Sequence, residues 1–250
     1  MQIAIYPDSD TLSREAAGYV VRMIQQAIGT RGHCMLALAG GSTPQKLYGL
    51  LASKPYRDQI DWPVMEIFWS DERCVPPESA ESNYAMARES LLNHVPIPAS
   101  HVHRMPADLA DRDAASQAYT VEMQRVFGRR DMPIFDLIQL GMGPEGHTAS
   151  LFPHQDSLHE QHRLVMPVTV PKPPPPRLTF TPPLLNAARH VLFLVTGSDK
   201  AEALKAVLED PYQPDEYPAQ VVRPTDGEVT WMLDTAAAAL LSARKDLNTL

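Results

Sequence analysis

The chain has 250 residues, of which 44% are hydrophobic, and it carries a formal net charge of −8 at pH 7. That negative charge argues against a general nucleic-acid binder, although a small anionic ligand needs only a local positive site. No apolar run approaches the ~18–20 residues that cross a membrane, no secretory signal is visible, and two cysteines make no disulfide framework. We therefore expect one cytoplasmic domain spanning residues 1–250.

The N-terminal part predicts a strand followed by a long helix. The strand covers Ile3–Tyr6 and the helix covers Ser13–Ile28, in which apolar residues recur on one face. Ser13 could cap this helix, and Gly29 lies just past its end.

The next segment combines the features of a phosphate-binding site. A continuous apolar strand over Met35–Ala39 runs into the turn Gly40-Gly41, after which Ser42 or Thr43 can cap a helix. Free N–H groups and the positive end of a helix dipole then point the same way, which favours a bound phosphate. The alternative is an ordinary capped helix after a tight turn.

Charged residues follow the third predicted strand, Met65–Trp69. Asp71, Glu72 and Arg73 could form a solvated loop, but arginine can also bind phosphate or carboxylate through its planar fork. Cys74 has no base beside it in the sequence, which argues against a nucleophilic role. Three elements are expected next: a helix over Ser82–Leu92 capped by Ser82 or Asn83, a short strand over Val102–Met105, and a helix over Asp111–Phe127.

The stretch 135–153, FDLIQLGMGPEGHTASLFP, holds the strongest catalytic candidate. A short apolar strand ends in Gly141, Gly143 and Gly146, and His147 follows at once. Glycine permits close approach of the backbone to a ligand, and histidine is suited to proton transfer near neutral pH. The alternative is a glycine-rich turn with a hydrogen-bonded loop histidine.

Two segments after this stretch are expected to be irregular. His154, His159 and His162 match no zinc-binding spacing and indicate a hydrated loop. The proline-rich segment Pro171–Pro183 should be extended and stiff, and it should contain no helix.

The C-terminal part predicts further α/β units. A strand over Val191–Thr196 precedes a helix over Asp199–Leu208. Lys200 in the first turn of that helix would face the positive end of the dipole, unless Asp199 or a bound anion offsets the cost. A last strand over Val229–Leu233 should lead to a helix over Thr235–Ala243 capped by Asp234.

The polar residues that follow these strands should gather at one edge of a parallel sheet, where α/β proteins bind ligands. They could surround one cleft: Ser42, Thr43, Asp71, Arg73, His147 and Lys200.

Five motifs along the chain resemble those of the 6-phosphogluconolactonases in order and spacing. They are AGGSTP, WSDERCVP followed by SNY, LGMGPEGHTASLFP, TGSDKAEAL and RPTDGEVTWMLD. The resemblance implies a NagB/RpiA/CoA-transferase-like fold, a three-layer α/β/α sandwich around a mostly parallel, Rossmann-like sheet. It implies hydrolysis of 6-phospho-D-glucono-1,5-lactone to 6-phospho-D-gluconate in the oxidative pentose phosphate pathway, without a metal or an organic cofactor.

Two features bear on related activities. The glucosamine-6-phosphate deaminases share the glycine-histidine motif but usually continue from the histidine as HIAFNEP, so Phe152 stands where they have an acidic residue. This favours the lactonase over a deaminase or isomerase. A non-catalytic sugar-phosphate sensor is a third hypothesis, but the chain begins directly with a strand. The motif more often reads DGH, and Glu145 replaces that aspartate here, which leaves a catalytic role for residue 145 open.

The resulting hypothesis divides the site into two parts. Neutral His147 would take a proton from water, oriented by Asp71 or Glu145. The phosphate and the developing oxyanion would be bound by a glycine-rich set of amides and by basic side chains: Gly40, Gly41, Ser42, Thr43, Arg73, Gly143, Gly146, Arg177 and Lys200. The expected partner is the small-molecule substrate, with no nucleic acid or membrane, and the chain should be a monomer or a weak homo-oligomer.

Overall fold

The computed structural model describes residues 1–128, 131–174 and 176–242. Its centre is a six-stranded sheet in the order β1-β9-β8-β5-β2-β3, and every neighbouring pair in it is parallel. The strands are β1 (Gln2–Tyr6), β2 (Cys34–Leu38), β3 (Met65–Trp69), β5 (Leu137–Leu140), β8 (His190–Val195) and β9 (Glu228–Asp234).

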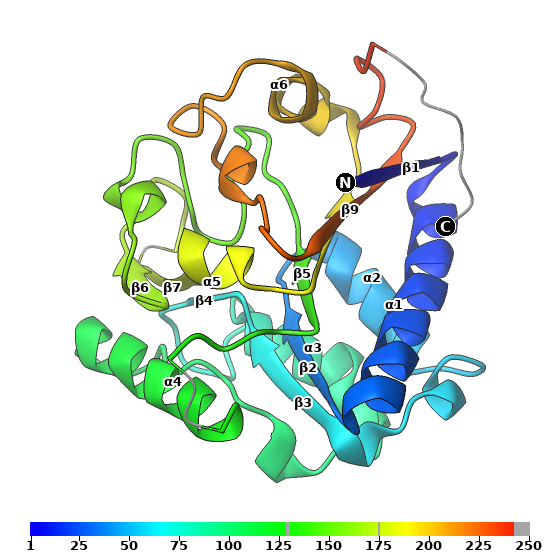
Figure 1. Cartoon of the computed structure of the whole chain (residues 1–250), viewed down its shortest axis with the longest axis vertical. Coiled ribbons are helices and arrows are strands. Elements are labelled where there is room, and N and C mark those ends of the chain that lie inside the picture. Colours follow the sequence, from blue (N-terminus) through cyan, green and yellow to red (C-terminus); the bar gives the residue numbers. More distant parts are fainter. Residues whose placement is uncertain (129–130, 175, 243–250) are drawn as a thin grey trace.

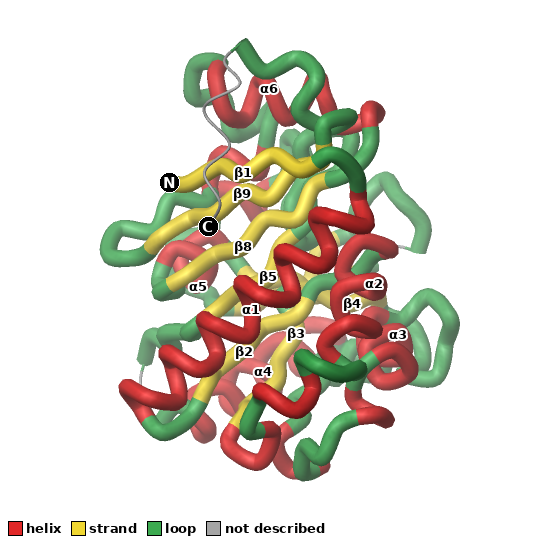
Figure 2. Tube along the Cα trace, turned by 90° about the vertical axis from the view of Figure 1, so that its right-hand side faces the viewer, coloured by secondary structure: helices red, strands yellow, loops and turns green. Residues whose placement is uncertain are grey.

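Helices cover both faces of this sheet, which confirms the predicted three-layer α/β/α arrangement. Helices α1 and α2 lie on one face, while α5 and a small antiparallel sheet lie on the other (Figures 1 and 2). The helices are α1 (Ser9–Arg31), α2 (Ser42–Leu51), α3 (Asn83–Ser90), α4 (Arg112–Val126), α5 (Pro182–Asn186) and α6 (Ala201–Glu209). The small sheet has the order β4-β7-β6, with β4 (Asp71–Arg73), β6 (Val165–Val168) and β7 (Arg177–Phe180).

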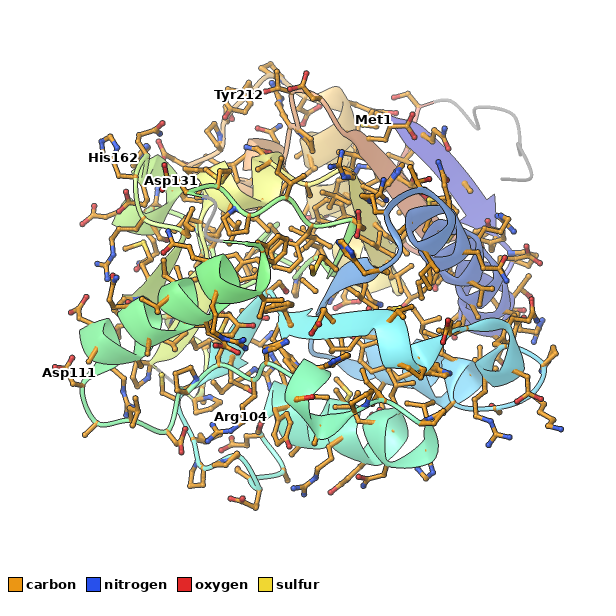
Figure 3. All side chains as sticks on the ribbon, turned by 60° about the horizontal axis from the view of Figure 1, so that its bottom comes forward. Met1, Arg104, Asp111, Asp131, His162 and Tyr212 are labelled. Atoms are coloured by element: carbon orange, nitrogen blue, oxygen red, sulfur yellow. The ribbon has the colours of Figure 1, made fainter. Side chains whose placement is uncertain are left out.

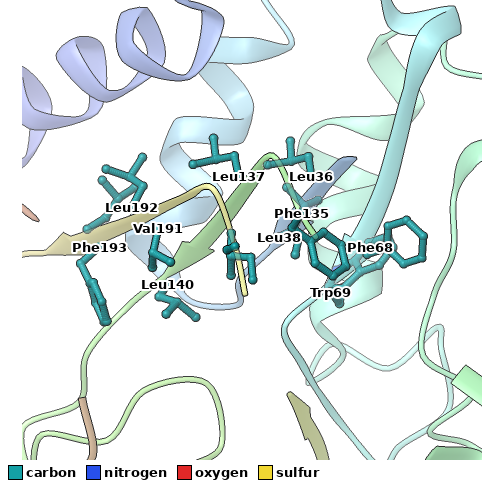
Figure 4. Close-up of a cluster of buried hydrophobic side chains, with 14 of the residues drawn as sticks. Leu36, Leu38, Phe68, Trp69, Phe135, Leu137, Leu140, Val191, Leu192 and Phe193 are labelled. Atoms are coloured by element: carbon teal, nitrogen blue, oxygen red, sulfur yellow. The ribbon is translucent and has the colours of Figure 1, made fainter. Parts of the chain in front are cut away.

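The core forms where the central strands are covered on both sides. All residues of β2 and β5 are buried, as expected for parallel strands with helices on each face. Phe68 of β3 packs edge-on against Phe135 with ring centroids 5.3 Å apart, and both lie in the cluster shown in Figure 4. Polar side chains such as those of Arg104, Asp111 and His162 project from the periphery (Figure 3).

The sheet reverses its winding direction between β2 and β5. The chain passes from β2 outward to β3 at one edge, then returns across β2 to β5, and from β5 it continues to β8 on the opposite side. A reversal of this kind opens a crevice beyond the carboxyl ends of the two strands. The loops that follow β2 and β5 are the two glycine-rich segments.

The predicted cap and end of the first helix are wrong. Asp8 caps α1 by accepting a hydrogen bond from Thr11 N at 2.7 Å, so the helix begins at Ser9, one turn earlier than predicted. Ser13 is buried inside the first turns and donates to Ser9 O. Gly29 lies within the helix, which ends at Arg31 and is followed by Gly32 as the C-cap, in the left-handed region with φ of 79°. Sequence spacing could not choose between two glycines so close together.

Two short elements also differ from the prediction. Val102–Met105 is not a strand: Val102 makes one isolated parallel bridge to Ile67, and the backbone then leaves the sheet edge. Residues 235–240 form turns and not the predicted helix, while Ala243 lies outside the described residues. Asp234 accepts a hydrogen bond from Ala237 N at 2.7 Å, as a helix cap would, but here the bond closes a turn.

The proline-rich segment contains one helical turn that was not expected. Its C-terminal end forms β7 and then α5, and Pro182 and Pro183 occupy the first positions of α5. A missing N–H costs nothing at these positions, and the fixed φ of proline suits a helix start. Of the two predicted caps of α3, Ser82 is the one that the structure shows. Asp111, expected as the first residue of the next helix, is the N-cap of α4.

Candidate active site

A cleft of about 450 Å³ lies beyond the carboxyl ends of four neighbouring strands, β8, β5, β2 and β3. Most of the residues predicted from the sequence line it: Gly40, Gly41, Ser42, Thr43, Asp71, Arg73, Gly143, His147, Arg177 and Lys200. Glu145 and Gly146 do not line the cleft, although they belong to the same loop as Gly143 and His147. Lys172, Thr196 and Asp199 line it as well and were not predicted.

The N-terminus of α2 points into this cleft without a cap of its own. Gly41, with φ of 111°, occupies the N-cap position and makes no side-chain hydrogen bond, so the predicted capping by Ser42 or Thr43 is wrong. The first intrahelical bond runs from Gln45 N to Gly41 O at 3.0 Å. In the described chain the hydroxyl of Thr43 pairs only with Thr196 Oγ1, at 2.9 Å. The first amides of α2 therefore remain available to an anion.

Gly40 is required by the close approach of a neighbouring side chain. A Cβ atom at this position would lie 1.9 Å from Asn83 Oδ1. Asn83 in turn donates to Asp71 through Nδ2, to its carbonyl at 2.9 Å and to Oδ1 at 3.3 Å. The contact explains why the GGST turn and the SNY motif occur together.

Asp71 and Glu72 are buried, so the alternative of a solvated loop at 71–73 is wrong. Glu72 binds the N-terminus of α3: it accepts from the amides of Asn83 and Tyr84, both at 2.8 Å. Ser82 Oγ and Arg73 N donate to the same carboxylate, at 3.0 and 2.7 Å. Burial raises the pKa of Glu72, and these four hydrogen bonds oppose that shift.

The loop after β5 is closed by its own hydrogen bonds. Gly143 N donates to His147 O at 2.9 Å, and Gly146 N donates to Gly143 O at 3.0 Å. Gly146 has φ of 78°, which favours glycine. A Cβ atom on Gly143 would lie 2.0 Å from His147 Nδ1, so this glycine leaves the space that the imidazole occupies.

The imidazole of His147 is held by two further contacts. Its ring stacks on Phe152, with centroids 4.0 Å apart and planes 13° apart. Its Nδ1 lies 3.2 Å from Glu145 Oε1. The contact with His147 lowers the pKa of Glu145 to about 2, against the effect of burial. Asp71 instead accepts from Ser150 Oγ at 2.7 Å, so Glu145 is the carboxylate in contact with the histidine.

Positive side chains enter the cleft from three segments. Arg73 of β4 and Arg177 of β7 are directly opposite each other in the small sheet. Arg73 donates through Nη1 to Glu81 O at 2.7 Å. The prediction that Lys200 lies in the first turn of a helix is wrong. Lys200 immediately precedes α6, and its ammonium pairs with Asp199. That ion pair lowers the pKa of Asp199.

The described residues contain no group of three or more His, Cys, Asp or Glu side chains arranged to hold a metal ion. His154 and His159 lie near Glu216 and Asp215, at 3.5 and 2.9 Å, with exposed side chains, as a hydrated loop predicts. No helix in the described part of the chain is both long enough and apolar enough to cross a membrane.

These features define an α/β protein with an anion-binding cleft and a carboxylate-paired histidine at its sheet edge. The family described as glucosamine-6-phosphate isomerases/6-phosphogluconolactonase matches residues 7–231. The chain is 39% identical to "Probable 6-phosphogluconolactonase 2" of Oryza sativa subsp. indica, over 98% of this chain and 91% of the relative. It is 40% identical to the 6-phosphogluconolactonase of Synechocystis, over 94% and 96% of the two chains.

Solved structures agree with these sequence matches. The 6-phosphogluconolactonase from Trypanosoma cruzi superposes with a TM-score of 0.85 at 30% identity and covers 97% of both chains. The chain therefore belongs to the family of glucosamine-6-phosphate isomerases and 6-phosphogluconolactonases. The NagB-like fold predicted from the five motifs is thereby confirmed.

Proposed function

We propose that the protein hydrolyses 6-phospho-D-glucono-1,5-lactone to 6-phospho-D-gluconate, as a 6-phosphogluconolactonase. The observation that carries this proposal is the position of His147, which faces the same cleft as the uncapped N-terminus of α2. A phosphate bound at the helix would place the other end of one six-carbon ester beside the imidazole. The names of the relatives agree with this activity.

The phosphate binds at the end of the cleft formed by the turn after β2. Gly40 and Gly41 let the backbone approach the ligand, and the amides and hydroxyls of Ser42 and Thr43 donate to its oxygens. Lys200, on the loop after β8, adds a positive charge. Binding energy from this remote group positions the lactone carbonyl at the histidine.

His147 acts as the general base and then as the general acid. Because Nδ1 faces Glu145, Nε2 is the nitrogen available to the substrate. It takes a proton from the attacking water and returns it to the ring oxygen as the C–O bond breaks. Acid–base help of this kind contributes about 10²–10⁴-fold.

Arg73 is the favoured donor to the developing oxyanion. The amides of Gly143 and Gly146 are already used within the loop after β5, whereas Arg73 Nε is buried without a hydrogen-bond partner in the described chain. A well-placed donor to an oxyanion contributes about 3–4 kcal/mol to catalysis. Asp71, buried beside Arg73, accepts hydrogen bonds from Asn83 Nδ2 and Ser150 Oγ and so keeps this wall of the cleft ordered.

The alternatives make different predictions. Phe152 leaves no carboxylate at the position that carries one in the deaminase motif, which favours the lactonase over a deaminase or isomerase. A sugar-phosphate sensor would bind the ligand without turnover. We further propose that the protein works in the cytoplasm as a monomer or weak homo-oligomer, without a cofactor and without a nucleic-acid or membrane partner.

Turnover of freshly generated 6-phosphogluconolactone tests the proposal. Hydrolysis releases a proton, so a weakly buffered indicator assay follows the rate directly. The protein should exceed spontaneous hydrolysis, and unphosphorylated gluconolactone should be a poor substitute. Ammonia release from glucosamine-6-phosphate would favour the deaminase, and tight binding of 6-phosphogluconate without lactone turnover would favour the sensor.

A further inference from the structure

Arg177 begins β7 at the wall of the cleft and differs from the other cations there, because it is only 4% exposed. Its Nε donates to Pro174 O at 3.3 Å, and its Nη2 donates to the carbonyls of Lys172 and Pro173 at 3.3 and 3.4 Å. Most of its guanidinium is therefore engaged with residues 171–174, which we name the proline loop.

The proline loop has few backbone N–H groups with which to form hydrogen bonds of its own. Three of its four residues are prolines, which have no N–H to donate, so their carbonyls depend on donors from elsewhere. A guanidinium offers five donors in a rigid plane and can reach several carbonyls at once. Arg177 supplies this set of donors from the strand that follows the loop.

The same guanidinium also lies against the aromatic ring that supports the histidine. Arg177 Cζ lies 5.7 Å from the centroid of Phe152, within the range of a cation–π contact. Phe152 also stacks on the ring of His147. Arg177 thus connects the proline loop to the support of the imidazole.

Lys172 is the residue of the proline loop that lines the cleft. Within the described chain it has no ion pair within 4 Å. Its charge acts on the carboxylates of Glu145 and Asp199, which come from two other loops of the site. The cross-strand pair of Arg73 and Arg177 adds two like charges, an arrangement that a bound anion would stabilise.

We propose that Lys172 is an additional substrate-binding cation and that Arg177 is a positioning residue, which holds the proline loop over the cleft and against the Phe152–His147 stack. This inference rests on the proposed lactonase function for its substrate. It deepens that function by assigning to Arg177 an indirect role in place of direct phosphate binding.

The first test compares Lys172→Met with Lys205→Met. Lys205 lies on α6, pairs with Asp210 at 3.5 Å and does not line the cleft, so it is a matched control. Loss of one charge-assisted contact should raise the KM for the lactone and the Kd for 6-phosphogluconate about tenfold, with kcat changed less than about twofold. An unchanged KM and Kd in Lys172→Met would overturn the assignment of Lys172.

The second test separates positioning from direct binding by Arg177→Lys, which keeps the charge but removes the fork. If Arg177 acts through the loop, this variant should raise KM as much as Lys172→Met does, and the double variant should be no worse than either alone in KM. It should also lower kcat, because the Phe152–His147 stack loses its support. Additive effects on KM, or near-normal kinetics in Arg177→Lys, would show direct binding and contradict the positioning role.

A third measurement does not depend on turnover. Acetylation of lysines, followed by mass spectrometry, should show Lys172 protected by 6-phosphogluconate and Lys205 unprotected. In Arg177→Lys the reactivity of free Lys172 should rise and the protection should fall. If the wild-type protein proves inactive on the lactone but the change in free Lys172 reactivity persists, the proposed function fails while the loop role stands. Equal reactivity of Lys172 in both proteins would overturn the loop role itself.

Discussion

The imidazole of His147 is fixed on several sides, so few of its orientations remain. Its own carbonyl closes the loop through Gly143 N, its ring stacks on Phe152, and its Nδ1 faces Glu145. A general base must hold its reactive nitrogen within hydrogen-bond reach of the proton it abstracts. Immobilising the ring in advance serves this requirement, because the orientation is set before the substrate arrives.

Replacing the histidine tests its catalytic role directly. His147→Gln keeps a polar side chain of similar size but cannot accept and return a proton, so kcat should fall by at least about 10²-fold. Binding of 6-phosphogluconate should stay within about threefold of wild type, since the phosphate binds elsewhere. Calorimetry and lactone hydrolysis measure the two effects, and turnover near the wild-type rate would exclude His147 as the base.

Glu145 should contribute only through the histidine. With its pKa lowered to about 2, its carboxylate is charged at pH 7 and can orient the ring and stabilise the imidazolium. Glu145→Gln should therefore lower kcat about tenfold with little change in KM. In the His147→Gln background the same substitution should cost nothing further. A full additional loss in the double variant would mean that the carboxylate has its own role in the reaction.

The glycines show what residue identities alone could and could not predict. The sequence indicated Gly143 as a position of close backbone approach to a ligand and Gly40 as part of a turn, and both line the cleft. The side chain that leaves room only for glycine at position 40 could not be predicted, because Asn83 is 43 positions away along the chain and meets Gly40 only after folding. The choice of Glu145 over Asp71 as the partner of His147 likewise depended on side-chain geometry.

At the scale of elements, two helices present their N-termini at this edge of the structure and differ in what occupies them. The N-terminus of α3 is filled by the protein itself, through Glu72 and Ser82. The N-terminus of α2 has no side-chain cap. Both ends carry partial positive charge, so the one without an internal carboxylate is the one suited to an anionic ligand.

The strands and long helices could be predicted, because apolar runs and helical periodicity are local signals. The errors lie at short elements and helix ends. The turns at 235–240 carry five consecutive residues with good helix propensity, yet Asp234 uses its carboxylate on Gly197 N and Ala237 N, and the chain does not continue as a helix. Such competition between local propensity and a distant hydrogen bond is invisible in one sequence.

Helix α4 supplies a test of pH dependence away from the cleft. Arg125 and His103 lower the pKa of Glu122 to about 2, because both donate to its carboxylate, and burial opposes them. A carboxyl with a lowered pKa stabilises the fold above its unfolded pKa of about 4.5, and this contribution is lost as the pH falls toward the folded value. Glu122→Gln should thus be less stable than wild type at pH 5.

The difference between these two proteins should shrink at lower pH. Urea unfolding at pH 5 and pH 3 would measure it, since at pH 3 a carboxylate that is free in the unfolded chain is mostly protonated. Lys54→Met, which removes an exposed ion pair with Asp58 outside the network of Glu122, His103 and Arg125, is a suitable control for general charge effects. If the difference in unfolding free energy between wild type and Glu122→Gln grew as the pH fell, the lowered pKa assigned to Glu122 would be contradicted.

At the scale of the whole molecule, the site exists because the sheet reverses its winding between β2 and β5. The loops that carry the anion-binding turn and the histidine are more than 90 positions apart in sequence, yet they follow adjacent strands. The sequence predicted that polar strand ends would meet at one edge, as parallel pairing requires. It could not supply the strand order, which decides that these two loops are neighbours.

Because the cleft joins segments from most of the chain, ligand binding should stabilise the fold as a whole. A ligand at 100 times its Kd stabilises the native state by about 2.7 kcal/mol, which for a chain of this size raises Tm by about 5–10 °C. 6-Phosphogluconate should produce such a shift, and inorganic phosphate a smaller one. Gluconate lacks the phosphate and should produce little shift at the same concentration.

A Lys200 variant tests whether this stabilisation comes from the proposed phosphate site. Lys200→Met removes a cation that lines the same cleft as the α2 N-terminus, so at fixed ligand concentration the shifts with 6-phosphogluconate and with phosphate should both fall by at least half, as a weaker Kd requires. Lys205→Met, on the adjacent helix but outside the cleft, should retain the full shifts. Differential scanning fluorimetry measures all three proteins in parallel. Equal shifts in wild type and Lys200→Met would place the phosphate elsewhere, because a site that includes this ammonium cannot lose it without losing affinity.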